Sequence, residues 1–243
     1  MGKDYRVQTL ENAHGMFRSA TNAAMYAEAA KQFEYLVHEE NIVNGHLFYT
    51  LGNSWFMAGD VGRAILNYRR AEQHLPNSED VQHNLNAALA LRTDLIPQQD
   101  PHPFAASVLG WHTETSAALR GWLFAGCWLL FWSAWLWTSR SVKKEARITA
   151  YVAGILSVIL MGSLLAETWV NIRRRPGVIV AEEVVARKGD AAMYAPAFRE
   201  PLHAGTEFTL REVRGMWWHI QLADGQACWI PASAAETVAL TFQ

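Results

Sequence analysis

Residues 45–78 read GHLFYTLGNSWFMAGDVGRAILNYRRAEQHLPNS, and this stretch determines how the N-terminal part of the chain folds. It holds two runs of apolar residues at helical spacing, separated by Gly59-Asp60 and closed by Pro76. Apolar residues that recur every three or four positions lie on one face of a helix, and glycine and proline end helices. The sequence therefore predicts two amphipathic helices, joined by a tight turn.

The same stretch resembles a tetratricopeptide repeat, a pair of antiparallel helices that stacks on copies of itself. The residues that match this pattern are Phe48, Leu51, Gly52, Trp55, Ala64, Tyr68, Ala71 and Pro76. Gly52 and Ala64 allow the two helices to approach closely, while Trp55 and Tyr68 fill the space between them and against neighbouring repeats. We therefore interpret Leu51, Gly52, Trp55, Ala64, Tyr68, Ala71 and Pro76 as residues that pack the repeat.

Weaker copies of the pattern flank this repeat. Residues 16–38 are rich in alanine and predict a helix in which Ala29 corresponds to Ala64. Residues 80–91 restart the first helix of a further repeat, with Leu85 and Leu89 on its apolar face. We predict an all-α repeat domain of about two and a half repeats over residues 1–94. A linker with several prolines follows over residues 95–118.

Two long runs without a charge follow the linker, at residues 121–139 and 148–166. At ~1.5 Å per residue, each nearly spans the ~30 Å hydrocarbon core of a bilayer. A short turn with Arg140, Lys143, Lys144 and Arg147 separates them, so we predict a transmembrane helical hairpin over residues 119–172. The alternative is a buried helical pair in a soluble core.

Most of the 11 tryptophans lie in or beside these two runs. Trp122, Trp135, Trp137 and Trp169 fall near the run ends, where indole favours the membrane interface. Trp128 and Trp132 lie deeper and share one helix face. That face either packs on Gly154, Ser157 and Gly162 of the second run or points to lipid.

Residues 173–243 alternate in hydrophobicity with a period of two, which predicts a small all-β barrel of short strands. The expected strand segments include 178–185, 193–194, 207–210, 217–222 and 228–231. Asp224-Gly225 between two apolar runs predicts a hairpin. The order of the segments 202–206, 215–218, 222–225 and 229–231 resembles a bacterial SH3-like domain, with Cys228 where that pattern has glycine.

The composition excludes several classes of function. The chain carries 21 Lys+Arg against 23 Asp+Glu, a formal net charge of −2, which gives no basic field for nucleic acid. Two cysteines and nine histidines without metal-ligand spacing predict no metal site and no cofactor. No nucleophile motif occurs, and pairing of Glu167 with His112 as an acid and a base has no support in their spacing, so we expect no enzyme activity.

Helical repeats, a tryptophan-rich membrane hairpin and an SH3-like barrel, in that order, resemble the BatE-like membrane proteins of bacterial aerotolerance operons, over about residues 16–238. The resemblance implies a membrane scaffold that acts beside von Willebrand-type domain proteins and a MoxR-type ATPase. Members of this family often begin with a signal peptide. Residues 1–12 here show no apolar segment of that kind.

Two surfaces are candidates for binding. Repeat arrays bind extended peptides along the first helix of each repeat, where this chain has His46, Tyr49, Asn53 and Phe56. The alternative is an array that packs only against itself. In the barrel, Tyr194, Trp217, Trp218 and Trp229 either form an aromatic ligand surface or, for at least two of them, fill the core.

The sequence thus predicts a non-enzymatic, membrane-anchored scaffold that recruits a protein or peptide through its repeats. The alternative is a cell-envelope module whose SH3-like barrel binds peptidoglycan or a wall peptide. The predicted location is the bacterial inner membrane, with two spans. Arg120 and Arg173 to Arg175 balance the four basic residues of the turn, so charge does not orient the hairpin. The missing signal peptide favours cytosolic domains, whereas the family resemblance and the usual extracytoplasmic use of bacterial SH3-like domains favour the periplasm, which we predict.

Overall fold

The computed structural model describes residues 2–97, 111, 115–138 and 144–240 and divides the chain into two compact units. The first unit joins Met1–Gln99 to Arg175–Gln243, and the second comprises Asp100–Arg174. The first unit is therefore built from two segments that the second unit separates in the sequence. Much of the predicted linker, at residues 98–110 and 112–114, lies outside the described residues.

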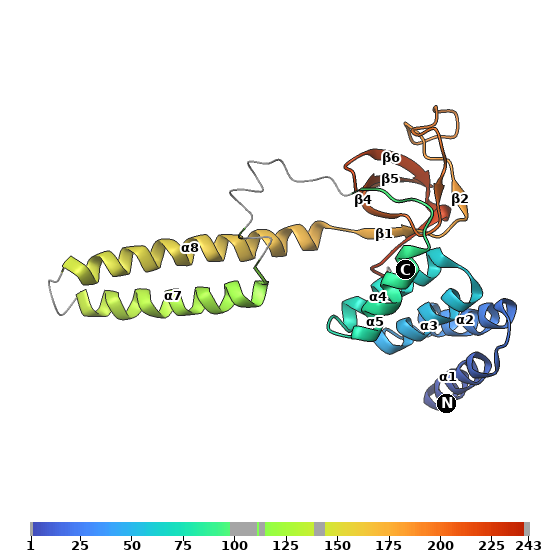
Figure 1. Ribbon diagram of the computed structural model, residues 1–243, viewed down its shortest axis with the longest axis horizontal. Coiled ribbons are helices and arrows are strands. Elements are labelled where there is room, and N and C mark those ends of the chain that lie inside the picture. The colour runs from blue at the N-terminus through green and yellow to red at the C-terminus, as the bar shows by residue number, and fades with distance from the viewer. Residues whose placement is uncertain (1, 98–110, 112–114, 139–143, 241–243) are drawn as a thin grey trace. The chain divides into compact units, whose positions relative to one another are not determined.

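The N-terminal segment is an array of antiparallel helices (Figure 1). Its helices are α1 (Gly2–Ser19), α2 (Ala23–His38), α3 (Gly45–Ala58), α4 (Val61–His74) and α5 (Glu79–Ala90). The helix pair predicted within 45–78 is confirmed as α3 and α4. Gly59 ends α3 in a left-handed conformation (φ 86°), and Asp60 caps α4 by accepting a hydrogen bond from the Arg63 amide at 2.9 Å.

The prediction of one helix over residues 16–38 is wrong, because the chain breaks at residues 20–22. Asn22 adopts an extended conformation and its side chain accepts from the Met25 amide at 3.0 Å, which starts a new helix. Asparagine competes with the helical backbone for hydrogen bonds and so favours this capping position over a helix interior. The residues before the break continue upstream as α1.

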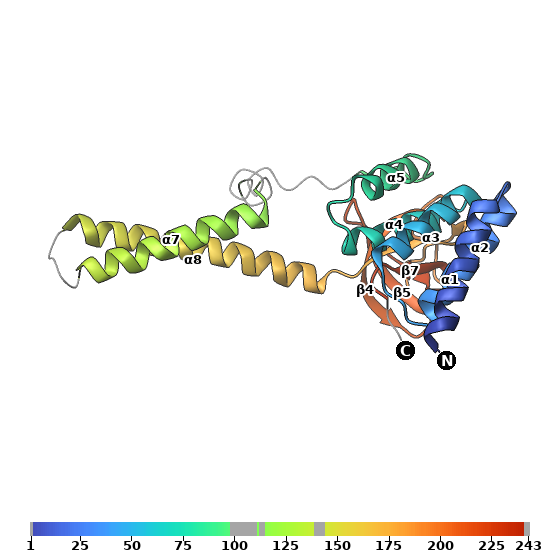
Figure 2. The same cartoon turned by 90° about the horizontal axis from the view of Figure 1, so that it is seen from below.

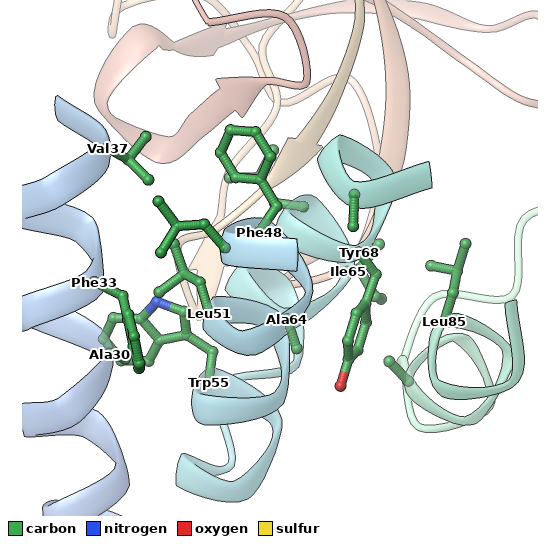
Figure 3. Close-up of a cluster of buried hydrophobic side chains, with 14 of the residues drawn as sticks. Ala30, Phe33, Val37, Phe48, Leu51, Trp55, Ala64, Ile65, Tyr68 and Leu85 are labelled. Atoms are coloured by element: carbon green, nitrogen blue, oxygen red, sulfur yellow. The ribbon is translucent and has the colours of Figure 1, made fainter. Parts of the chain in front are cut away.

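One hydrophobic core runs through α2, α3, α4 and α5. Figure 3 shows Trp55 of α3 reaching the face of α2 that carries Ala30 and Phe33, with Tyr68 of α4 on the side of α5. Gly52 is required at this crossing, since a Cβ there would lie 2.7 Å from the Tyr68 ring. The other residues predicted to pack the repeat are also buried, except Pro76, which is exposed in the turn after α4.

The C-terminal segment is a small antiparallel sheet domain. Its strands are β1 (Pro176–Ile179), β2 (Glu183–Val184), β3 (Leu202–His203), β4 (Glu207–Arg214), β5 (Trp217–Leu222), β6 (Ala227–Pro231) and β7 (Ala235–Thr237), with a 3-10 turn, η1 (Ala232–Ala234), before β7. Five strands pair in the order β6-β5-β4-β1-β7, and β2 pairs with β3. Ile179, Ile220 and Ile230 form the fully buried centre of its core.

The hairpin predicted at Asp224-Gly225 is confirmed, because β5 and β6 pair on either side of it and Gly225 has a φ of 84°. The strand predicted at Met193-Tyr194 is wrong. These residues lie in a turn between β2 and β3, where the Tyr194 ring covers Gly189 and Met193 is 90% exposed. Apolar character alone did not distinguish a turn from a strand here.

The sheet domain packs against α4, as Figures 1 and 2 show for β1 and the neighbouring strands. Val178 of β1 and Val238 after β7 are buried in the core of the helical array. The backbones approach so closely that a Cβ on Gly62 of α4 would lie 2.8 Å from the carbonyl oxygen of Ile179. The two segments thus form one folded body.

The second unit is a helical hairpin of α7 (Ala117–Thr138) and α8 (Lys144–Arg173). Both helices are long and apolar enough to cross a membrane, with mean hydropathies of 1.2 and 2.1 in their apolar windows. Only 6% and 17% of these windows are buried. This exposure disagrees with the alternative of a helical pair buried in a soluble core.

Trp128 and Trp132 contact each other edge to face, and they are 44% and 46% exposed. Phe131, rather than either tryptophan, lies over Gly154, at 3.2 Å from the position of a Cβ on that glycine. A Cβ on Gly162 would meet nothing within 4 Å. Neither tryptophan therefore packs on Gly154 or Gly162.

A buried polar contact joins the two helices of the hairpin. Arg120 of α7 is 2% exposed and donates hydrogen bonds to Ser163 Oγ at 2.7 Å and to the carboxylate of Glu167. Glu167 thus pairs with Arg120. His112, its partner in the acid–base pair considered from the sequence, lies outside the described residues.

Gly52→Ala is expected to lower the thermal unfolding midpoint of the helical array, because the added Cβ overlaps the Tyr68 ring, and overpacking a buried site costs about 1–3 kcal/mol. Gly15→Ala is the matched control, since its Cβ meets nothing within 4 Å and alanine favours a helix. Circular dichroism of the detergent-solubilised chain measures both. An unchanged midpoint for Gly52→Ala would show that the crossing is looser than described.

Glu167→Leu is expected to destabilise the hairpin, because it leaves the buried Arg120 guanidinium without the carboxylate that offsets its charge. Breaking a buried ion pair from one side costs about 3–5 kcal/mol, whereas replacing both partners by apolar residues is often neutral. Arg120→Leu/Glu167→Leu should therefore restore the unfolding midpoint, followed by tryptophan fluorescence in detergent. A double variant no more stable than Glu167→Leu argues against the pair.

Candidate protein-binding surface

The four residues predicted to bind a peptide all lie on α3, but they differ in accessibility. His46 is exposed in the first turn, where its amide donates to the Asn44 side chain at 2.8 Å. Tyr49 and Phe56 are half-buried and pack against the core of the array. Asn53 is also half-buried. This part of α3 therefore offers a partner a mixed polar and aromatic face.

A hydrogen-bond network connects this face with the neighbouring helices. Asn53 Oδ1 accepts from Tyr68 Oη at 2.8 Å and from Asn84 Nδ2 at 2.9 Å, and Asn84 also donates to Tyr49 Oη at 3.0 Å. Burial raises the pKa of Tyr68, so its hydroxyl remains a donor at neutral pH. Because Asn53 Oδ1 is already engaged twice, contact with a peptide would use the Asn53 amide as a donor.

Asn84 of α5 was missed by the sequence analysis, although it completes the network. Its side chain comes from the helix that restarts the repeat pattern, at a polar position beside the apolar Leu85. Contact between α3 and α5 brings Asn84 to Tyr49 and Asn53. A search for polar residues on the first helix of each repeat, rather than on one repeat, would have found it.

Trp55 fixes the opposite side of α3. Its Nε1 donates to Glu34 Oε1 of α2 at 2.9 Å, and the Arg63 guanidinium lies 4.8 Å above its ring. Burial raises the pKa of Glu34, and the hydrogen bond from Trp55 and the charge of Arg63 oppose that rise. Trp55 is therefore a packing residue, only 6% exposed, and contributes no surface for a ligand.

Basic side chains of α4 hold the sheet domain. Arg70 is 4% exposed and donates to Glu236 at 3.0 Å, to the Thr237 carbonyl at 3.0 Å and to the Val238 carbonyl at 3.3 Å. Burial lowers the pKa of Arg70, and the neighbouring carboxylate of Glu236 opposes the effect. On the same face, Arg69 pairs with Glu207 of β4 at 2.7 Å.

A second contact fastens the end of the array to the turn after β3. Asp94 accepts from the His203 amide at 2.7 Å, the His203 ring Nδ1 at 2.8 Å and Thr206 Oγ1 at 2.6 Å. Burial alone would raise the pKa of the Asp94 carboxyl. The three hydrogen bonds together outweigh burial and lower the pKa below its ordinary value.

The four aromatic residues predicted as a barrel surface have different environments. Trp229 is 9% exposed and stacks on His219 at a ring distance of 4.7 Å, with the Arg214 guanidinium 5.0 Å from its ring. Trp218 packs against the sheet core. Trp217 is half-buried and Tyr194 is 46% exposed. His219 and Arg214, which complete this stack, could have been found from their pairing positions opposite Trp229 and Trp217.

Cys228 is a free, buried cysteine of the sheet domain. Burial and the charge of Asp224 raise the pKa of the Cys228 thiol to about 12, so the thiol stays protonated and is a poor nucleophile at neutral pH. The described residues contain no group of three or more side chains of the types that ligate metals.

Comparison with known families, with curated proteins and with solved structures found no match to this chain. The helical face and the sheet domain are thus interpreted from their own geometry.

Stability should depend on the ionisation of Asp94. Because the folded-state pKa is lowered, the carboxylate stabilises the fold above its ordinary pKa of about 4, and this contribution is lost as the pH falls through the folded value. Asp94→Asn should lower the unfolding midpoint at pH 7 and reduce its fall between about pH 5 and pH 2. Parallel pH-dependent fluorescence melts of both proteins measure this difference, and identical slopes would contradict it.

Proposed function

We propose that this protein is a non-enzymatic, membrane-anchored adaptor that recruits a protein partner through the face of α3 and α5. The observation that carries the proposal is the docking of the sheet domain on α4. This docking occupies α4 and leaves His46 exposed and Tyr49, Asn53 and Phe56 partly accessible. The sheet domain covers one face of the array, and the other face carries polar and aromatic groups. Such a face suits peptide recruitment.

The helical array is proposed to be a tetratricopeptide-repeat domain and the sheet domain an SH3-like barrel. The buried Gly52, Ala64 and Tyr68 support the first assignment, and the strand order with the confirmed β5–β6 hairpin supports the second. With the two candidate spans, these assignments support a BatE-like role in a complex with von Willebrand-type domain proteins and a MoxR-type ATPase.

Both binding domains are proposed to lie on one side of the bilayer, since they share one folded body and an even number of spans separates them. We place them in the periplasm of a bacterial inner membrane. Arg120 is buried against Glu167, which leaves Arg173 to Arg175 against the four basic residues of the turn. The more basic turn then favours the cytoplasm. A reporter fused after Gln243 that is active only when exported tests this placement, and activity in the cytosol would contradict it.

Tyr49→Ala/Asn53→Ala is expected to abolish capture of the partner, measured by pull-down with a purified von Willebrand-type domain protein and a purified MoxR-type ATPase. The double variant removes an aromatic surface and an amide donor from the α3 face. Tyr68→Phe is the matched control, because it removes a hydrogen bond from the same network at a side chain that is fully buried.

Loss of capture in the double variant but not in Tyr68→Phe would support recruitment through this face. Equal loss in both would mean that the network acts through stability, and unchanged capture in the double variant would overturn the proposal. Sedimentation of the same proteins with purified cell wall tests the alternative, a wall-binding sheet domain. Co-sedimentation without partner capture would favour that function.

A further inference from the structure

A cavity of about 710 Å³ opens on the first unit beside the turn from α3 to α4. Its volume falls within the range of small-ligand pockets, roughly 300–1,000 Å³. The polar side chains in its lining are Asp60, Arg63, Thr93, Glu182, Glu183 and His203. These residues come from both segments of the unit, so the cavity exists only when the sheet domain is docked on the array.

Part of the lining is apolar. Val61 begins α4, Leu91 follows α5 and is 60% exposed, and Val180 follows β1. Small alanine side chains at positions 58, 181 and 204 complete this part. Such a surface suits the aliphatic portion of a long side chain whose charged end remains near polar groups.

Two atoms at one side of the cavity, His203 Nε2 and Glu183 Oε1, are candidate acceptors for one donor group. Asp94 is ionised and can only accept, so the His203 Nδ1 at 2.8 Å must carry the proton. When the ring carries a single proton, that proton lies on Nδ1 and Nε2 is an acceptor. Nε2 lies 3.9 Å from Glu183 Oε1. This distance is too long for a direct hydrogen bond but allows one donor group to contact both atoms.

The charge around these acceptors is negative. Arg63 is engaged with Asp60 at 2.7 Å and lies over the Trp55 ring, so its charge is offset within the lining. Glu182 and Glu183 are exposed, and neither has a basic side chain other than His203 within ion-pair distance in the described residues. The cavity therefore complements a cation.

We propose that this cavity binds a lysine side chain of a partner polypeptide. The ammonium group would donate to both His203 Nε2 and Glu183 Oε1, while its aliphatic stem lies on Val61 and Leu91. An ammonium has three rotatable donors and can bridge two separate acceptors, whereas the planar guanidinium of arginine matches the two oxygens of one carboxylate. The site is separate from the α3 face and does not rest on the function proposed above.

The test uses the full chain in nanodiscs with its histidines labelled at ¹³Cε1. The His203 signal is assigned by its loss in His203→Gln. Three peptides serve as probes: acetyl-AAKAA-amide, acetyl-AARAA-amide and acetyl-AAQAA-amide. We expect the lysine peptide to shift the His203 signal in a saturable way, and the other two to bind at least tenfold more weakly.

Glu182→Gln/Glu183→Gln should weaken binding of the lysine peptide at least tenfold, and both positions are exposed, so the variant should fold. Glu200→Gln is the matched control, because Glu200 is exposed in the turn between β2 and β3 and does not line the cavity. Its affinity should stay within twofold of the original. Three outcomes would each overturn the proposal: an unmoved His203 signal, equal binding of the three peptides, or equal affinity of Glu182→Gln/Glu183→Gln and Glu200→Gln for the lysine peptide.

Discussion

The guanidinium of Arg70 is the contact on which the first unit most depends. This guanidinium is buried on α4. It donates hydrogen bonds to Glu236 and to two backbone carbonyls near the C-terminus. A buried cation is tolerated only when its hydrogen-bonding capacity is met. The sheet domain therefore supplies the hydrogen-bond acceptors that a buried arginine of the helical array requires.

The two segments of the first unit are separated in the sequence by residues 100–174. The second segment of this unit begins at Arg175 and continues directly into β1, the strand that contacts α4. Arg69 and Arg92 both pair with Glu207, and Asp94 accepts from His203. These residues of the helical segment therefore also bind the sheet domain.

Local sequence patterns predicted much of the fold. The apolar spacing and the Gly59-Asp60 turn predicted α3 and α4, and Asp224-Gly225 predicted the β5–β6 hairpin, because each is decided by residues close together in the chain. The break at Asn22 was missed since alanines on both sides masked a capping residue. Met193-Tyr194 was assigned to a strand because its turn is held by Tyr194 covering Gly189, a contact that composition does not reveal.

The candidate sites were predictable only in part, for the same reason. Tyr49 and Asn53 follow from one helix, but Asn84 enters their network from another. Nothing in the sequence couples Asp94 with His203, since docking of the sheet domain on the helical array brings them together. Glu183 reaches the same ring through the pairing of β2 with β3. Polar contacts between residues distant in the sequence leave no pattern in the residues around them, so they cannot be predicted from one sequence.

The separation between Arg70 and Glu236, 166 positions along the chain, also sets an order of events during synthesis. At translation rates of about 5–20 residues per second, Glu236 is made roughly 10–30 s after Arg70. During that interval the two hairpin helices are made, and the Arg70 guanidinium lacks the partners that it has in the folded unit. Ribosome-associated chaperones or the membrane-insertion machinery therefore meet a half-finished domain, and truncation near the C-terminus would leave that nascent state permanent.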